Sequence, residues 1–74
     1  MNKFKEVKIT SEYITLGQFL KFADIIANGG EAKEFIAEHD IFVNGTTCKM
    51  RGKKLYASDQ IVIDDSLFFE IGKW

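Results

Sequence analysis

Apolar and polar residues alternate at both ends of the chain. Near the start, Val7 and Ile9 are interleaved with charged residues, which predicts a half-exposed strand over Phe4–Ile9. Near the end, Gln60–Ile63 and Leu67–Ile71 are rich in β-branched and aromatic residues and predict two further strands. The last of these strands could pair with the first.

Between these strands the apolar spacing becomes helical. Thr15 followed three residues later by Gln18 is a capping-box pattern, in which the two side chains satisfy amides at a helix start. Apolar positions then recur every three or four residues. The pattern predicts a first helix that runs to Ile26 or Ala27.

A second helix and a hairpin follow. Asn28-Gly29-Gly30 is typical of a helix end, and Glu31 then begins a second helix that ends near His39. Asn44-Gly45 after an apolar pair is the strongest short-range hairpin pattern. The order of elements predicts a small α+β protein, with two helices on one side of an antiparallel sheet.

Composition supports one small domain over residues 1–74. The chain is 46% hydrophobic and contains seven Phe, enough to form a core. No apolar run approaches the roughly 18 residues of a membrane span. With a single cysteine, Cys48, and no secretory signal, the chain is expected in a reducing cytoplasm.

Little in the sequence points to catalysis or to a metal. His39 and Cys48 are the only residues of their types, and a structural zinc site needs four ligands. No nucleophile–base spacing or phosphate loop is present. We therefore expect no enzyme activity, no metal and no cofactor, and interpret His39 as a cap at a helix C-terminus.

The most unusual feature is a short cationic cluster. The net charge of the chain is −1, yet no acid lies between Ile41 and Ser58, and this segment gathers four cations. They are Lys49, Arg51, Lys53 and Lys54. Phosphate is the commonest partner of such a surface, while the alternative is a solvated loop that keeps an edge strand soluble. The stretch after it is acidic, so one face should be basic and another acidic.

Several segments of the chain resemble one known family. They are Thr15-Leu16-Gly17-Gln18-Phe19-Leu20-Lys21, Gly29-Gly30-Glu31-Ala32-Lys33, Val43-Asn44-Gly45, Arg51-Gly52-Lys53-Lys54-Leu55-Tyr56 and Ser58-Asp59-Gln60-Ile61. Together they resemble the S4 RNA-binding domain, and most closely the small free-standing bacterial members called YaaA. The resemblance, over about residues 7–71, implies the S4-like (alpha-L motif) fold, two short helices packed on a four- or five-stranded antiparallel sheet.

The resemblance also implies where RNA is contacted. The expected RNA-binding residues are Lys21, Gly29, Gly30, Lys33, Lys49, Arg51, Lys53 and Lys54. Members of the family commonly have Arg-Leu-Asp in place of Thr15-Leu16-Gly17, which leaves Lys33 and the cationic cluster to carry more of the electrostatics. A shared site requires these side chains to project toward a common side.

We expect a monomeric RNA-binding module for structured RNA with an accessory role, and the resemblance implies association with ribosomal RNA and assembly of the large ribosomal subunit. The alternative is a protein-interaction module that docks through the acidic C-terminal strands, Asp59 to Glu70. An enzyme acting on RNA ranks third. Tyr56 could stack on an exposed base, but an aromatic just after a basic loop is more often an edge of the core, which we favour.

Overall fold

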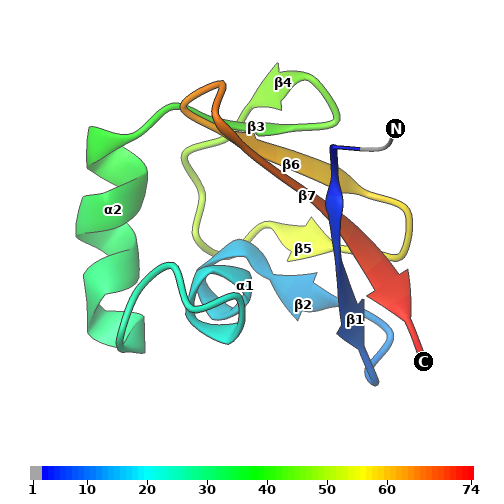
Figure 1. Ribbon diagram of the computed structural model, residues 1–74. Helices are drawn as coiled ribbons and strands as arrows, with labels where there is room; N and C mark the ends of the chain where they lie inside the picture. Colours follow the sequence, from blue (N-terminus) through cyan, green and yellow to red (C-terminus); the bar gives the residue numbers. More distant parts are fainter. Residues whose placement is uncertain (1–2) are drawn as a thin grey trace.

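The computed structural model describes residues 3–74, and the strands and helices follow one another as Figure 1 shows. In chain order they are β1 (Lys5–Ile9), β2 (Ile14–Thr15), α1 (Leu16–Phe22), a 3-10 turn η1 (Gly29–Glu31), α2 (Ala32–Glu38), β3 (Ile41–Val43), β4 (Thr46–Thr47), β5 (Lys54–Leu55), β6 (Gln60–Ile63) and β7 (Leu67–Lys73). The domain predicted over residues 1–74 includes Met1 and Asn2, which lie outside the described residues.

The large sheet has five strands in the order β1-β7-β6-β3-β4. The first and last strands of the chain do pair, with Val7 opposite Ile71, but they run parallel. All other neighbours in this sheet are antiparallel. The sheet is therefore mixed, and the prediction of a purely antiparallel sheet was wrong for this one pair. Alternation of apolar residues fixes which side chains face the core, but it carries no information on strand direction.

The helices α1 and α2 lie together on one side of the large sheet (Figure 1), as the α+β prediction required. The core fills the space between these layers, and its members alternate along the strands and recur at helical spacing along the helices. They are Val7, Ile9, Leu16, Phe19, Leu20, Ile26, Ala32, Ile36, Ile41, Val43, Leu55, Ile61, Ile63, Phe69 and Ile71. The rings of Phe19 and Phe69 meet edge to face across the two layers, with centroids 5.4 Å apart.

The first helix is shorter than the sequence predicted. It ends at Phe22 because Asp24 adopts a left-handed conformation, with φ 63°. The amide of Ile25 then donates to Leu20 O (2.9 Å) and the amide of Asp24 to Lys21 O (3.1 Å), which together form a Schellman motif. Ile26 lies beyond the end of the helix but is buried in the core, so the helical spacing of apolar residues continues past Phe22.

The predicted turns and caps are present. Thr15 and Gln18 form a capping box at the start of α1. Asn44 and Gly45 both have positive φ, 51° and 84°, as a two-residue hairpin turn requires. The Asn28 side chain caps η1, through which the chain enters α2. These local patterns set the start of α1, which carries Lys21, the entry into α2, which carries Lys33, and the hairpin that precedes Lys49.

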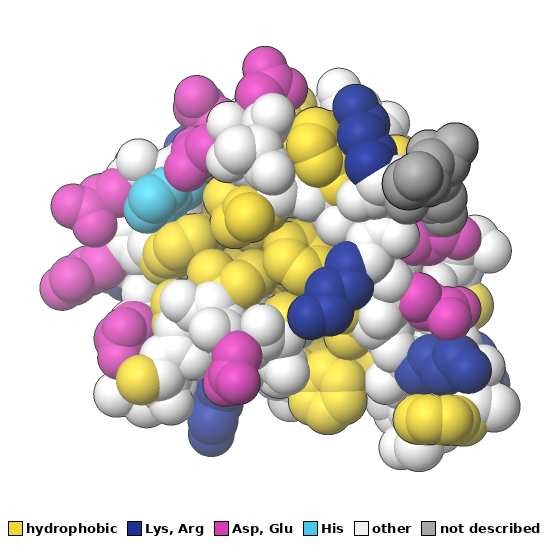
Figure 2. Space-filling view, viewed as in Figure 1, with side chains coloured by type: hydrophobic (Ala, Val, Ile, Leu, Met, Phe, Trp, Pro, Cys, Tyr) yellow, Lys and Arg dark blue, Asp and Glu magenta, His cyan; other side chains and the backbone are white. Residues whose placement is uncertain are grey.

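Charge is unevenly spread over the surface. Seen from the side of Figure 1, hydrophobic side chains are exposed in the middle of the molecule (Figure 2). Acidic side chains gather along the α2 side and the upper edge of this face.

Candidate nucleic-acid interface

The ten Lys and Arg residues of the chain divide into two groups by the elements that carry them. Four lie on or beside the parallel pair of strands, and we call them the β1–β7 lysines: Lys3, Lys5, Lys8 and Lys73. Six lie on α1, on α2 and on the segment from β4 to β5, and we call them the cationic track: Lys21, Lys33, Lys49, Arg51, Lys53 and Lys54. The track contains every cation predicted to bind RNA.

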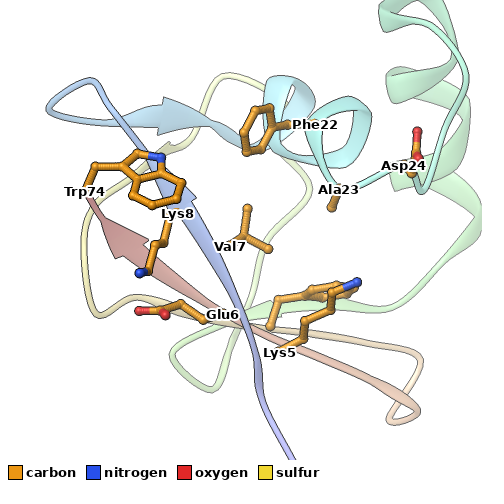
Figure 3. A pocket seen from close by; sticks show the side chains of 9 residues that line it. Lys5, Glu6, Val7, Lys8, Phe22, Ala23, Asp24 and Trp74 are labelled. Atoms are coloured by element: carbon orange, nitrogen blue, oxygen red, sulfur yellow. The ribbon is translucent and has the colours of Figure 1, made fainter.

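The β1–β7 lysines share their surroundings with acids and aromatic rings. Lys5 and Lys8 line a hollow beside β1 that also holds the side chains of Glu6 and Asp24 (Figure 3). The Lys8 Nζ lies 4.7 Å from the centroid of the Trp74 ring. Because Glu6 and Asp24 line the same hollow, Lys5 and Lys8 present a weaker positive field to solvent.

The cationic track follows three adjoining hollows. Their cationic lining residues are Lys21 and Arg51 in the first, Lys33, Arg51 and Lys49 in the second, and Lys49, Lys53 and Lys54 in the third. Arg51 belongs to the first two hollows and Lys49 to the last two, so the hollows form one continuous surface. Lys33 thus shares one hollow with Arg51 and Lys49, and Lys49 shares the next hollow with Lys53 and Lys54.

Acidic side chains are nearly absent from these hollows. No Asp or Glu among the described residues lines the first two, and Asp59 alone lines the third. Both carboxylate oxygens of Asp59 accept hydrogen bonds, from the Asn44 side chain (3.0 Å) and from the Tyr56 amide (2.8 Å). Asp59 thus holds two turns together through its two carboxylate oxygens.

The start of α1 holds the basic segment in place. The amide of Leu16 donates to Lys53 O (2.8 Å), and that of Gly17 donates to Arg51 O (2.9 Å). These are first-turn amides that have no partner inside the helix. A Cβ at Gly17 would lie 3.4 Å from Arg51 O, an ordinary contact distance, so the two segments adjoin here without requiring glycine. The short pairing of β2 with β5 completes this attachment.

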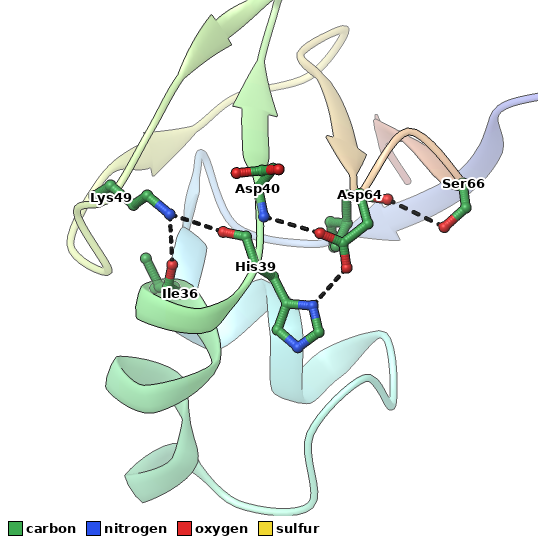
Figure 4. A network of polar contacts seen from close by, with 7 residues as sticks. Ile36, His39, Asp40, Lys49, Asp64 and Ser66 are labelled. Carbon is green, nitrogen blue, oxygen red and sulfur yellow. Dashed lines mark hydrogen bonds and ion pairs between the residues drawn. The ribbon is translucent and has the colours of Figure 1, made fainter.

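Lys49 differs from the other members of the track because its ammonium group is already engaged (Figure 4). The Lys49 Nζ donates to Ile36 O (3.1 Å) and to His39 O (2.8 Å). These carbonyls belong to the C-terminal end of α2, where partners are missing and the helix dipole favours a cation. Sequence reasoning missed this role, since Lys49 is ten residues from His39 and no local pattern joins them.

The same end of α2 is joined to the β6–β7 turn through Asp64 (Figure 4). Asp64 Oδ2 lies 2.5 Å from His39 Nδ1, and Asp64 Oδ1 accepts from the Asp40 amide (2.9 Å). The hydrogen bond with His39, followed by that with the Asp40 amide, lowers the pKa of the Asp64 carboxyl. Within residues 3–74 this is the single contact between a basic and an acidic side chain at ion-pair distance. The predicted capping position of His39 is observed, with a carboxylate partner in addition.

The two glycines at the start of η1 differ in what their amides can offer. Gly29 lines the first hollow together with Lys21 and Arg51. The Gly30 amide donates to Asn28 Oδ1 (3.1 Å) and is therefore already paired. Of the two amides expected to face a phosphate, that of Gly29 is the one placed beside the track.

Tyr56 is exposed, so the expectation that it forms an edge of the core was wrong. Its exposed fraction is 43%, because Leu55 takes the inward position of β5 and the next residue points outward. The Tyr56 ring lies beside that of Tyr13, with centroids 5.8 Å apart. Tyr13 was not predicted as part of the site, and nothing in its local sequence marks it.

Across the described part of the chain, no three His, Cys, Asp or Glu side chains come together in a way that could hold a metal ion. None of the helices in residues 3–74 is long and apolar enough to cross a membrane.

Comparison with known proteins agrees with the fold and with the resemblance noted from the sequence. The family model described as the S4 domain matches residues 7–69. The chain therefore belongs to the S4 domain family. It is also similar to a protein of Bacillus subtilis (strain 168) named "Probable ribosome maturation protein RlbA". The two are 46% identical over 65 residues, which cover 88% of this chain and 92% of that protein.

Proposed function

We propose that this protein is a non-catalytic RNA-binding module that acts as a cytoplasmic monomer, without a metal or cofactor. It binds structured RNA through the cationic track, and ribosomal RNA is its target. Its role is accessory, in maturation of the ribosome and specifically in assembly of the large subunit.

The continuity of the cationic track is the observation that carries this proposal. Three hollows share Arg51 and Lys49, and among described residues their single carboxylate belongs to Asp59. Cations on such a surface bind phosphate and release counterions from the nucleic acid. Phosphate contacts of this kind fix the position and orientation of the partner.

Structured RNA fits this surface better than a flexible strand. Lys21 lies on α1, Lys33 on α2, and Arg51 on a segment whose backbone is bonded to the start of α1. The core holds these elements at fixed separations, so the matching phosphates should also be fixed in space. Folded RNA supplies phosphates in a defined arrangement and is recognised largely by shape.

The ribosomal part of the proposal is supported by the similar protein of Bacillus subtilis. The name of that protein refers to ribosome maturation, and the match covers 88% of this chain and 92% of that protein. Similar length and 46% identity make a shared role the simplest expectation.

Docking of a protein through the acidic C-terminal strands has less support. Asp59 is bonded to Asn44 and to the Tyr56 amide, while Asp64 is bonded to His39. These carboxylates hold the fold together and have less capacity left for a partner. Retention of one protein partner after nuclease treatment would favour this alternative.

The test removes four charges from the track and spares Lys49, whose ammonium caps α2. The variant carries Lys33→Gln, Arg51→Gln, Lys53→Gln and Lys54→Gln. Its affinity for purified ribosomal RNA, measured by filter binding, should fall more than about tenfold, and the log–log salt slope should flatten by about 3. The control variant carries Lys3→Gln, Lys5→Gln, Lys8→Gln and Lys73→Gln and loses the same charge. Unchanged affinity in the track variant would reject the proposal.

A further inference from the structure

We propose that the third hollow of the cationic track holds one unpaired RNA nucleotide, whose base stacks on the ring of Tyr56. This inference rests on the proposed function, and it specifies the class of RNA: a paired stem interrupted by an unpaired base.

The hollow combines cations with an accessible aromatic ring. Tyr56 lines it together with Lys53 and Lys54, and 43% of Tyr56 is exposed. Tyr13 stands beside Tyr56 and is itself 38% exposed. The Lys54 Nζ lies 4.9 Å from the centroid of the Tyr13 ring. One hollow is thus lined by a partly exposed aromatic residue and by two lysines.

The backbone that carries Tyr56 is held in place in the free protein. The Tyr56 amide donates to Asp59 Oδ2 (2.8 Å), and the Asp59 amide donates to Tyr56 O (3.0 Å). Asp59 in turn accepts from Asn44, whose own carbonyl oxygen Oδ1 accepts from the Gln60 amide (2.9 Å). A turn tied to the neighbouring hairpin in this way loses little conformational freedom on binding.

The chemistry of the hollow selects an unpaired base. Bases inside a continuous stem are stacked on their neighbours and offer no free face, whereas bulged or looped bases can be placed against an aromatic side chain. Lys53 and Lys54 can meet the phosphates on either side of such a nucleotide. Met50, which is 68% exposed in the same hollow, supplies an adaptable apolar surface.

The position of the hollow explains how a stem and an unpaired base are bound together. Lys49 lines both this hollow and the second one, where Lys33 and Arg51 lie. A stem whose phosphates contact Lys33 and Arg51 would therefore present a neighbouring bulge to Tyr56. The third hollow is therefore one end of the cationic track and not a separate site.

The test compares two RNA hairpins with the same stem, one fully paired and one with a single bulged 2-aminopurine. The wild-type chain should bind the bulged hairpin about tenfold more tightly, the effect of one base stacked on an aromatic ring. The 2-aminopurine fluorescence should also be quenched on binding. Equal affinity for the two hairpins, whether strong or weak, would overturn the proposal.

Three variants locate the effect. Tyr56→Leu should lose the preference and the quenching, while Tyr56→Phe should keep both. Phe22→Leu is the matched control, because Phe22 is also an exposed aromatic, at 60%, and lines none of the three hollows of the track. Circular dichroism checks that each variant is folded, and a preference retained in Tyr56→Leu would overturn the assignment.

The experiment distinguishes failure of base stacking on Tyr56 from failure of RNA binding by the track. If Tyr56→Leu behaves as the wild type while the four-charge track variant loses both hairpins, stacking is wrong and RNA binding by the track stands. If the four-charge variant binds both hairpins as well as the wild type does, the proposed function itself fails.

Discussion

The β1–β7 lysines and the cationic track are built from the same residue types but differ in their surroundings. Lys5 and Lys8 share a hollow with Glu6 and Asp24. In the track, the only acid among the described lining residues is Asp59, and its oxygens are already bonded. Charge number therefore does not define the candidate interface. What distinguishes the track is that two helices and the segment from β4 to β5 bring its cations around hollows whose described lining includes one carboxylate, that of Asp59.

The largest effect is expected when charge is reversed by the same amount in each group of cations. Lys33→Glu with Arg51→Glu should weaken binding of ribosomal RNA about a hundredfold, since two attractions become two repulsions next to phosphate. Lys5→Glu with Lys8→Glu changes the net charge equally and should cost less than about threefold. Filter binding at one fixed ionic strength measures both.

Equal weakening by the two double variants would mean that overall charge, rather than the arrangement of the track, governs binding. Repeating the measurement at several salt concentrations separates these cases. The salt slope should flatten for the track variant and stay close to the wild-type slope for the other.

Sequence patterns predicted the parts of this fold that depend on near neighbours. The capping box of Thr15 and Gln18 and the turn at Asn44-Gly45 are each set by residues a few positions apart. The end of α1 was missed because Asp24 takes the left-handed position that Gly usually fills. The parallel pairing of β1 with β7 was missed because its cause is the path of the whole chain.

The candidate site was predictable to a similar degree. The cationic cluster and Lys33 stood out as charges and as part of the S4 resemblance. The sequence did not show that the ammonium group of Lys49 is already hydrogen-bonded, because its bonds to Ile36 and His39 join residues more than nine positions apart. The pairing of β2 with β5, which attaches the basic segment to the start of α1, was also not predicted. It spans two residues on each strand and is too short to give an alternating pattern.

Two cations of the track should differ in their effect on stability, because Lys49 is hydrogen-bonded to helix carbonyls and Lys53 is exposed. Lys49→Met keeps the aliphatic stem but removes two charged hydrogen bonds to helix carbonyls. It should lower the free energy of unfolding by about 1–2 kcal/mol. Lys53→Met should change it by less than about 0.5 kcal/mol, as expected for an exposed side chain. Urea denaturation followed by circular dichroism measures both, and equal stability of the two variants would contradict the capping role of Lys49.

A third, smaller effect is expected at Gly17, where α1 meets the basic segment. Gly17→Ala should raise the free energy of unfolding by about 0.5 kcal/mol, because alanine is the better helix former. The added methyl group meets only ordinary contacts, the nearest at 3.4 Å from Arg51 O. RNA affinity should therefore stay within about twofold of the wild type, measured by the same filter assay. Loss of RNA binding in this variant would show that Arg51 has less room than the structure indicates.

The smallest effect on stability is expected at Asp64, which is bonded to His39 and to the Asp40 amide at the C-terminal end of α2. Because the pKa of its carboxyl is lowered in the folded chain, the stabilisation is present above the ordinary carboxyl pKa and is lost as pH falls through the lowered one. Asp64→Asn should make the urea midpoint depend less on pH between about pH 5 and pH 2. Asp65→Asn, in the same turn, is the matched control and should retain the wild-type dependence. Since neither residue lines the track, RNA affinity at neutral pH should be the same in both variants. A loss confined to Asp64→Asn would mean that the end of α2 helps to position Lys33.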